Sequence, residues 1–343
     1  MGLGRYVARR ALNLVVLLLV IVGFNFVLFQ IVPFTTSCPG LSYNSCVQEL
    51  YVPVAPAKGG NASAIIEHER AQVISSFGFD QPLTTRFFLY FVDMFTGQYG
   101  YNIGGLIGGP VSQTVAERTP YTVLLLGTST IAAFVIGIGV GVLSAAKRGK
   151  IFDVGSLAVF LFINSLPVFF VGGILIILQI ITTHTAYVNL GTLTLTKYGL
   201  NAIAPTLRAM WLPFLSLTLV SIGGVYLTMR ATMIDVLSED YIVMARAEGL
   251  DERNVLYRHA FRNAVIPIAT LFALSIGFIL GGAVITEAVF DWPGLGSAIY
   301  GAVVTNDFPL EQAMFFIISL MVLAANFVVD VAYGFLDPRI KAG

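Results

Sequence analysis

The stretch DYIVMARAEGLDERNVLYRHAFRNAVIP (Asp240 to Pro267) is unusually polar for so apolar a chain. We call it the polar elbow. The chain holds 19 basic and 19 acidic residues, and eleven of these fall between Arg230 and Arg262. Each charge at the centre of a bilayer costs about 3 kcal/mol or more, so this segment cannot lie in hydrocarbon.

The polar elbow is predicted to form two short helices with a sharp corner between them. Residues 241–248 are good helix formers, Gly249 can take the left-handed conformation that ends a helix, and Asp251 can cap the next one. On the second helix, apolar side chains share one side and arginines lie elsewhere: Val255, Leu256, Ala260 and Phe261 against Arg253, Arg258 and Arg262. An amphipathic elbow at a membrane face suits docking against another protein.

Composition places the chain in a membrane. Hydrophobic residues make up 57% of the sequence and charged residues 11%, and the mean hydropathy is +0.84. Soluble domains carry about 25% charged residues, so a soluble fold is excluded and contact with membrane lipid is expected. The formal net charge is zero, which gives no reason to expect nucleic acid as a partner.

Six apolar stretches reach the about 20 residues that a helix needs to cross a bilayer. They cover approximately residues 11–32, 121–145, 154–181, 211–229, 264–289 and 313–336. The first follows three arginines and is longer than a signal-peptide core, so we expect a retained helix. An uncleaved signal anchor would give the same topology.

The distribution of Lys and Arg orients these spans. With the N-terminus inside, thirteen of these residues fall in cytoplasmic segments and six in external ones. This excess follows the positive-inside rule. We therefore expect an all-α, multi-pass protein of the cell membrane, with six transmembrane helices and with both termini and the polar elbow in the cytoplasm.

The spans divide the chain into three parts. Residues 1–33 hold the N-terminus and first helix, residues 34–120 form a long external segment, and residues 121–343 form a five-helix core with a cytoplasmic loop at 230–263. Cys38 and Cys46 lie in the external segment, where a disulfide is permissible and two unpaired thiols are an equal alternative. The same segment holds a lone glycosylation sequon at Asn61, and the role of residues 35–66 is open.

Two apolar stretches carry features that bear on packing or on a solute path. Gly137 and Gly141 are four residues apart in the second stretch, which lets another helix approach closely. In the third stretch Asn164 and Ser165 precede Pro167, which removes a backbone hydrogen bond and should kink the helix. Such a kink beside polar side chains could line a path for solute, or it could be a buried, hydrogen-bonded bend.

A second candidate for the solute path follows the fifth apolar stretch. Pro293, Gly294 and Gly296 predict a tight external re-entry, with Glu287 and Asp291 at its mouth. These carboxylates could meet a cationic substrate terminus, or they could belong to a solvated loop rim.

The sequence lacks the motifs of an enzyme or of a nucleotide-binding protein. Gly-x4-Gly-Lys-Ser/Thr does not occur, and residues 145–150 lack both its glycine spacing and its hydroxyl. The three histidines are scattered and no Cys/His cluster predicts a metal site. No Gly-x-Ser-x-Gly predicts a hydrolase. We therefore expect no catalytic residues, and no cofactor or metal bound by this chain.

Several motifs occur together in one order: Ala245-Arg-Ala-Glu-Gly249-Leu, Arg258-His-Ala-Phe-Arg-Asn-Ala-Val-Ile-Pro267, Thr286-Glu-Ala-Val-Phe-Asp-Trp-Pro-Gly-Leu-Gly296, Asp307-Phe-Pro309, Asn326-Phe-Val-Val-Asp-Val-Ala-Tyr333 and Asp337-Pro-Arg-Ile340. This combination resembles the permease subunits of binding-protein-dependent ABC importers, in the oligopeptide/dipeptide/nickel branch. The general form of the loop motif begins Glu-Ala-Ala, and of these only the last alanine, Ala245, is present. The branch-specific form therefore carries the match.

The resemblance implies a type I ABC importer permease bundle, in which the elbow is a coupling helix that seats in a groove of a separate ATPase. It assigns coupling to Tyr241, Ala245, Arg246, Ala247, Glu248, Gly249 and Leu250. The implied partners are a second homologous permease, two cytoplasmic ATPase subunits that hold ATP and Mg, and an external solute-binding protein. Short peptides are the expected substrate, although relatives carry oligosaccharides or nickel chelates. From another class, a channel or membrane scaffold would use the elbow for docking without nucleotide-driven transport.

Overall fold

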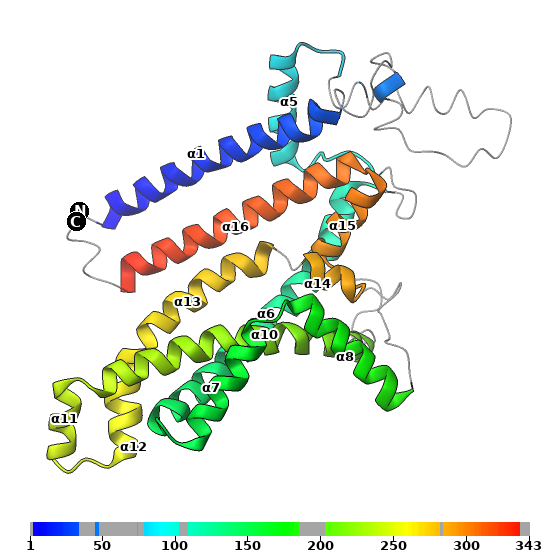
Figure 1. Cartoon of the computed structure of the whole chain (residues 1–343). Helices are drawn as coiled ribbons and strands as arrows, with labels where there is room; N and C mark the ends of the chain where they lie inside the picture. The colour runs from blue at the N-terminus through cyan, green and yellow to red at the C-terminus, as the bar shows by residue number, and fades with distance from the viewer. Residues whose placement is uncertain are drawn as a thin grey trace. The chain divides into compact units, whose positions relative to one another are not determined.

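The computed structural model of the chain is built from helices (Figure 1). It describes residues 3–33, 45–47, 74, 79–102, 109–184, 203–281 and 284–336. Within these ranges every regular element is a helix, and a single isolated β-bridge joins Tyr101 and Pro110. This agrees with the all-α expectation. Cys38, Asn61, most of the 35–66 segment and the motif at 337–340 lie outside the described residues.

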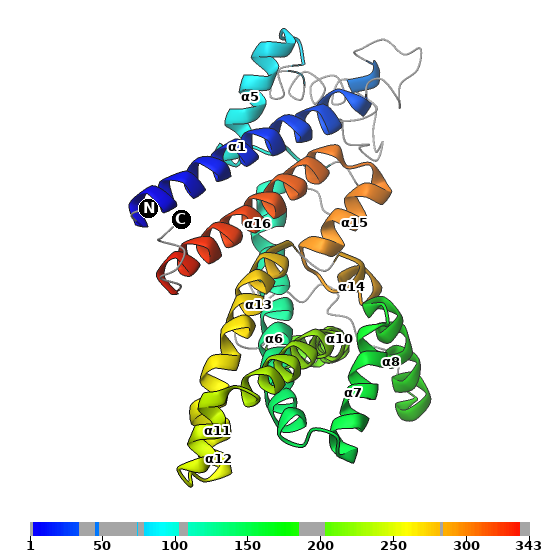
Figure 2. The ribbon, with the colours of Figure 1, turned by 60° about the vertical axis from the view of Figure 1, so that its left-hand side comes forward.

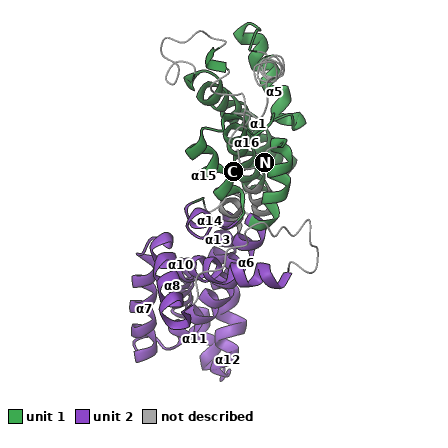
Figure 3. Ribbon diagram, turned by 90° about the vertical axis from the view of Figure 1, so that its right-hand side faces the viewer, with its two compact units in different colours: residues 1–121, 280–284, 293–343 green, residues 122–279, 285–292 purple. Residues whose placement is uncertain are grey.

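The helices follow one another along the chain as α1 (Leu3–Gln30), α5 (Leu83–Thr96), α6 (Val111–Ala146), α7 (Ile151–Asn164), α8 (Val168–Thr183), α10 (Ile203–Leu237), α11 (Asp240–Ala247), α12 (Glu252–Asn254), the π-helix η2 (Val255–Ala260), α13 (Phe261–Gly281), α14 (Val284–Val289), α15 (Leu295–Thr305) and α16 (Phe308–Leu336). They form two compact units (Figure 3). Unit 1 comprises residues 1–121, 280–284 and 293–343, and unit 2 comprises residues 122–279 and 285–292. Each unit has its own buried apolar core.

Several helices are suited to a bilayer. In the described part of the chain, α1, α6 and α10 are each long and apolar enough to cross it, and α7 with α8 would be a fourth span if a bent pair counts as one. The fifth and sixth apolar stretches of the sequence correspond to α13 with α14 and to α16. The chain is therefore a multi-pass membrane protein.

The third apolar stretch forms two helices rather than the single kinked helix predicted. Helix α7 ends at Asn164, α8 begins at Val168, and their axes differ by 102°. Pro167 has extended backbone (φ −62°, ψ 138°), it has no N–H to donate, and it disfavours helical backbone at Leu166. The prediction of a kink was therefore wrong in degree, because the proline ends the helix.

In unit 1, α1 and α16 lie antiparallel and side by side (Figures 1 and 2). Near the start of α1, Arg10 forms an ion pair with Asp330 at 3.2 Å. Near its end, the side-chain amide of Gln30 donates to that of Gln312 at 2.9 Å. Arg86 of α5 donates to the backbone oxygen and the side-chain oxygen of Gln30, both at 2.7 Å. Polar contacts therefore lie at both ends of the pair of helices.

In unit 2, α10 approaches α6 closely at the two glycines noted in the sequence. A Cβ atom on Gly137 would lie 2.8 Å from the Cβ of Val225, and one on Gly141 would lie 2.8 Å from the Cβ of Met229. Real Cβ atoms do not approach this closely, so glycine is what permits this helix spacing. The predicted close packing is confirmed.

Helix α7 runs antiparallel along another side of α10. Three pairs of residues mark this line of contact: Asp153 with Arg230, Phe160 with Tyr226, and Asn164 with Gly223. The last pair lies where α7 ends, directly before the break to α8. Glycine allows the approach there, because a Cβ on Gly223 would lie 2.6 Å from the Cβ of Asn164.

Gly223→Ala is expected to destabilise the protein, since the added Cβ would also lie 3.0 Å from the carbonyl oxygen of Phe160. Overpacking of this kind costs about 1–3 kcal/mol. The midpoint of thermal unfolding in detergent should fall by about 2–6 °C. Gly224→Ala is the control, because its Cβ would meet only the Asn164 side chain, at 3.9 Å. Equal falls in the two variants would contradict the assigned contact.

Candidate functional site

The polar elbow begins directly after α10 and returns the chain toward α13 (Figure 1). Its first helix, α11, ends where the sequence predicted. Gly249 has a φ of +80°, its amide donates to the carbonyl oxygen of Arg246 at 3.0 Å, and the amide of Leu250 donates to that of Ala245 at 3.3 Å. This pair of bonds is the Schellman closure of a helix. The corner predicted at Gly249 is therefore confirmed.

The second half of the elbow differs from the short, separate helix predicted. α12, η2 and α13 follow one another from Glu252 to Gly281, so the helix that starts in the elbow continues into the fifth apolar stretch. Residues 255–260 have wider π-helical turns, a form often found at functional positions. Asp251 occupies the N-cap position, but its side chain makes no capping hydrogen bond. Its predicted capping role was wrong.

The inner side of the elbow packs on α10 through an apolar cluster, here called the elbow cluster. Ile242 is fully buried in it, and a side chain of this size contributes about 1.5–3 kcal/mol when buried. The cluster draws its buried members from five elements: Phe134, Val142 and Ala145 of α6, Val225, Met229 and Met233 of α10, Ile242 and Ala245 of α11, Val255 and Ala260 of η2, and Ala264 and Ile268 of α13. The elbow is thus attached as part of the core of unit 2.

The outer side of the elbow exposes apolar side chains in the middle of a charged segment. Tyr241, Val243, Met244 and Leu250 are exposed, Met244 by 65%. Exposed apolar side chains gathered on one segment mark surfaces that another protein can cover. Six of the seven predicted coupling residues are exposed: Tyr241, Arg246, Ala247, Glu248, Gly249 and Leu250. The seventh, Ala245, belongs to the elbow cluster and so faces inward.

Two polar contacts brace the elbow. Arg246 donates from Nε to Oε1 of Glu252 at 2.8 Å, across the corner. Asn263 of α13 donates from Nδ2 to the hydroxyl of Tyr241 at 2.7 Å. Both contacts are exposed, so they add little stability and instead orient the two halves of the elbow. Beside them a shallow polar depression is lined by Asp251, Arg253, Asn254, Tyr257 and Arg258.

The predicted path residues of the third stretch lie at the break between α7 and α8. Asn164, Ser165 and Pro167 are exposed, and the Ser165 hydroxyl donates to the carbonyl oxygen of Phe162 at 2.7 Å. The alternative of a buried bend is therefore not what the chain adopts.

Of the two carboxylates predicted at the mouth of a re-entry, only one is exposed. Asp291 is exposed and has a φ of +47°. Glu287 is fully buried, and its Oε1 accepts a hydrogen bond from the Thr122 hydroxyl at 2.8 Å. Its placement at an open mouth was wrong, because α14 carries it into the core of unit 2. Phe290, the residue after α14, contacts α8, where a Cβ on Gly172 would lie 2.8 Å from the Phe290 ring.

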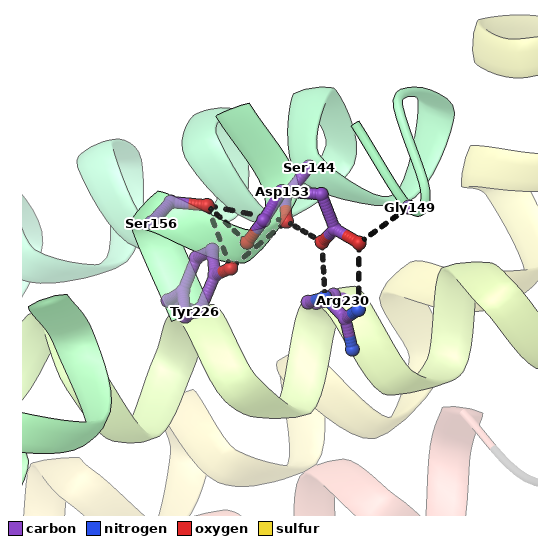
Figure 4. A network of polar contacts seen from close by, with 6 residues as sticks. All are labelled: Ser144, Gly149, Asp153, Ser156, Tyr226 and Arg230. Carbon is purple, nitrogen blue, oxygen red and sulfur yellow. Dashed lines mark hydrogen bonds and ion pairs between the residues drawn. The ribbon is translucent and has the colours of Figure 1, made fainter. Parts of the chain in front are cut away.

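A buried ion pair, Asp153–Arg230, was not predicted from the sequence (Figure 4). Nε and Nη2 of Arg230 donate to the two carboxylate oxygens of Asp153, at 2.6 and 2.9 Å. The Ser144 hydroxyl and the Gly149 amide donate to the same carboxylate, at 2.6 and 2.9 Å. The available signal was that Asp153 stands directly before the third apolar stretch and Arg230 directly after the fourth.

Metal binding has no candidate among the residues described, since no three His, Cys, Asp or Glu side chains there come together in a way that could hold an ion. The elbow combines a buried inner attachment with an exposed outer surface.

The chain matches a known protein family over most of the region described above. The family model described as the binding-protein-dependent transport system inner membrane component matches residues 137–342, which is more than half of the chain and includes the whole elbow. The chain belongs to this family. It is therefore a membrane permease subunit of a transport system, and permease subunits of this kind are not enzymes.

Relatives of this permease are similar over most of its length. It is 33% identical over 277 residues to the oligopeptide transport system permease protein AppB of Bacillus subtilis (strain 168), covering 81% of this chain and 86% of that protein. It is 35% identical over 299 residues to the glutathione transport system permease protein GsiC of Escherichia coli (strain K12), covering 84% and 90%. The dipeptide transport system permease protein DppB of the same strain is 32% identical over 301 residues, covering 81% and 86%. The branch indicated by the sequence motifs is confirmed.

Gly249→Ala is expected to loosen the corner, because a side chain at a φ of +80° is strained by about 1–2 kcal/mol. No atom lies within 4 Å of the added Cβ, so the backbone is the sole source of strain. Hydrogen exchange of the α11 amides should quicken about tenfold. Gly249→Asn, which tolerates this conformation, should have a smaller effect.

The control for this prediction is Gly155→Ala in α7, where the added Cβ also meets open space but the backbone is helical. It should leave α11 exchange unchanged. Identical exchange in the wild type and in Gly249→Ala would show that the corner does not depend on glycine.

Proposed function

We propose that the chain is the permease subunit of an ATP-driven importer that takes up short peptides delivered by an external solute-binding protein. The observation that carries the proposal is the family match across the polar elbow, joined to relatives named for oligopeptide, dipeptide and glutathione transport. Oligosaccharides or a nickel chelate are the alternative cargoes in this branch. The names of these relatives favour peptides.

The proposed assembly pairs this permease with a second homologous permease in the cell membrane. Two cytoplasmic ATPase subunits bind ATP and Mg, so this chain needs no nucleotide site of its own. Six spans with both termini inside put the polar elbow on the ATPase side, which agrees with the excess of Lys and Arg in the cytoplasmic segments over the external ones. In the external segment we also propose a Cys38–Cys46 disulfide, and Cys46 is buried.

The elbow is proposed to couple ATP binding to transport. Its exposed apolar residues, among them Met244 and Leu250, would fill a groove of the ATPase. When ATP closes the two ATPases, the elbow moves with them, and its buried inner side carries α10 along. The bundle then changes from inward-open to outward-open, and hydrolysis resets it. Coupling of this kind requires two states with different contacts in each.

The solute path is proposed to pass the break between α7 and α8, where Asn164, Ser165 and Pro167 are exposed. Asp291 is proposed to meet the charged amino end of a peptide. Glu287 is buried with Thr122, so we propose that it contributes only when the bundle opens. A channel or a membrane scaffold is not favoured, since the family is one of transport-system components.

Met244→Glu is expected to detach the ATPase, because it places a charge at the centre of the proposed docking surface. The permease should be purified gently from its own membranes and the bound proteins identified by mass spectrometry. Wild-type protein should recover an ATPase with a phosphate loop and a second permease, whereas the variant should recover only the permease. Ile151→Glu is the control, since Ile151 is 93% exposed and lies outside the elbow. Loss of the ATPase from both variants, or from neither, would count against docking at the elbow.

The substrate class is tested by uptake in cells that lack the gene. Uptake of a labelled tripeptide should be lost on deletion and restored by the wild-type gene, whereas uptake of a labelled oligosaccharide and of a nickel chelate should not change. Met244→Glu should fail to restore peptide uptake. If the deleted cells took up the peptide normally but lost uptake of the oligosaccharide or of the nickel chelate, peptides would not be the cargo, and the lost compound would be.

A further inference from the structure

The Asp153–Arg230 pair belongs to a buried network that joins three helices (Figure 4). The Tyr226 hydroxyl lies 2.8 Å from the Ser144 hydroxyl and 2.9 Å from the Ser156 hydroxyl. Ser144 in turn donates to Asp153. The network therefore connects α6 through Ser144, α7 through Asp153 and Ser156, and α10 through Tyr226 and Arg230.

The geometry of the ion pair is specific. The carboxylate of Asp153 is buried and accepts four hydrogen bonds, two of them from the fork of one guanidinium. Forked bonds of this type set direction as well as distance. Breaking one partner of a buried pair leaves an uncompensated charge, so the contact does not slide gradually. The best-attested use of such pairs is to fix the register of one element on another.

Helix α10 carries this network on one side and the elbow cluster on another. Tyr226 and Arg230 are four residues apart and therefore share one side of the helix. Met229 and Met233 are also four apart, and they face the elbow cluster. In the part of the chain that the structure describes, that cluster includes no residue of α7. Met233 is three residues from Arg230, so the two sides adjoin, and α10 contacts both the elbow cluster and α7.

The contact of α7 with α10 ends at the break before α8. Between the ion pair and the break, the contact consists of the hydrogen bond between the Ser156 and Tyr226 hydroxyls, of the Phe160 and Tyr226 rings, whose centroids are 4.6 Å apart, and of Asn164 against Gly223. Packing contacts and a single bond between hydroxyls tolerate small shifts better than a forked ion pair does. The ion pair is therefore the contact that fixes where α7, and with it the start of the break, lies along α10.

We propose that Asp153 and Arg230 are positioning residues for transport, fixing α7 to α10 so that movement of the elbow reaches the α7–α8 break. This inference rests on the proposed function. Without the ion pair, α10 would still follow the elbow, but α7 would no longer follow α10. ATP would be hydrolysed without solute being moved.

The test uses the whole importer, with its partner permease, its ATPases and its loaded binding protein, reconstituted in lipid vesicles. Stimulated ATP hydrolysis and uptake of a labelled tripeptide are measured together, and their ratio is the readout. Asp153→Asn, which keeps the size of the side chain and removes its charge, should leave hydrolysis nearly unchanged and lower uptake about tenfold or more.

The matched control makes the same substitution in an ion pair that is more exposed. Asp330→Asn removes the partner of Arg10, in a pair whose side chains are 43% and 30% exposed. Such pairs contribute little, so both rates should stay within about twofold of the wild type.

Arg230→Lys provides a second variant that keeps the charge but loses the fork. It should raise the ratio of ATP hydrolysed to peptide moved, by less than Asp153→Asn does. If the Asp153→Asn protein does not insert into the membrane, the ratio measured with Arg230→Lys tests the inference on its own. An unchanged ratio would overturn the inference, and so would a parallel fall of hydrolysis and uptake in Arg230→Lys, which is the result for a purely structural pair. Wild-type vesicles with no stimulated hydrolysis would overturn the proposed function itself, and the inference with it.

Discussion

Charge must stay out of hydrocarbon, and this permease meets that constraint in two ways. The polar elbow keeps its charges exposed, and its inner side is apolar enough to pack against α10. Within the bundle, the buried Asp153 is neutralised by Arg230 and by hydrogen bonds from Ser144 and Gly149. The charged elbow, which cannot enter the bilayer, is in this way attached to apolar helices that can.

Features that depend on a few neighbouring residues could be predicted from the sequence. The corner of the elbow is an example, because the left-handed backbone at Gly249 and the end of α11 are decided within one turn of helix. The buried side of the second helix was predicted in part: Val255 and Ala260 are buried, whereas Leu256 and Phe261 are only partly buried. The close approach of α6 to α10 followed from Gly137 and Gly141.

Features that depend on distant residues could not be predicted in this way. Asp153 and Arg230 are 77 residues apart, and their pairing depends on how α7 lies along α10. The burial of Glu287 depends on its contact with Thr122, which is far away in the sequence, so the residues around Glu287 do not predict it. At Pro167 the position of the irregularity could be predicted but not its angle, because the 102° bend is fixed by what α7 and α8 pack against.

The polar contacts between α1 and α16 have a consequence for biosynthesis. Gln30 and its partner Gln312 are separated by 282 positions, so at about 5–20 residues per second the first helix waits roughly 15–60 s for the last one to be made. During that interval Asn25 and Gln30 lack the acceptors that α16 provides, and lipid offers none in their place. A nascent chain that stops before α16 therefore keeps unsatisfied amide groups in its first helix.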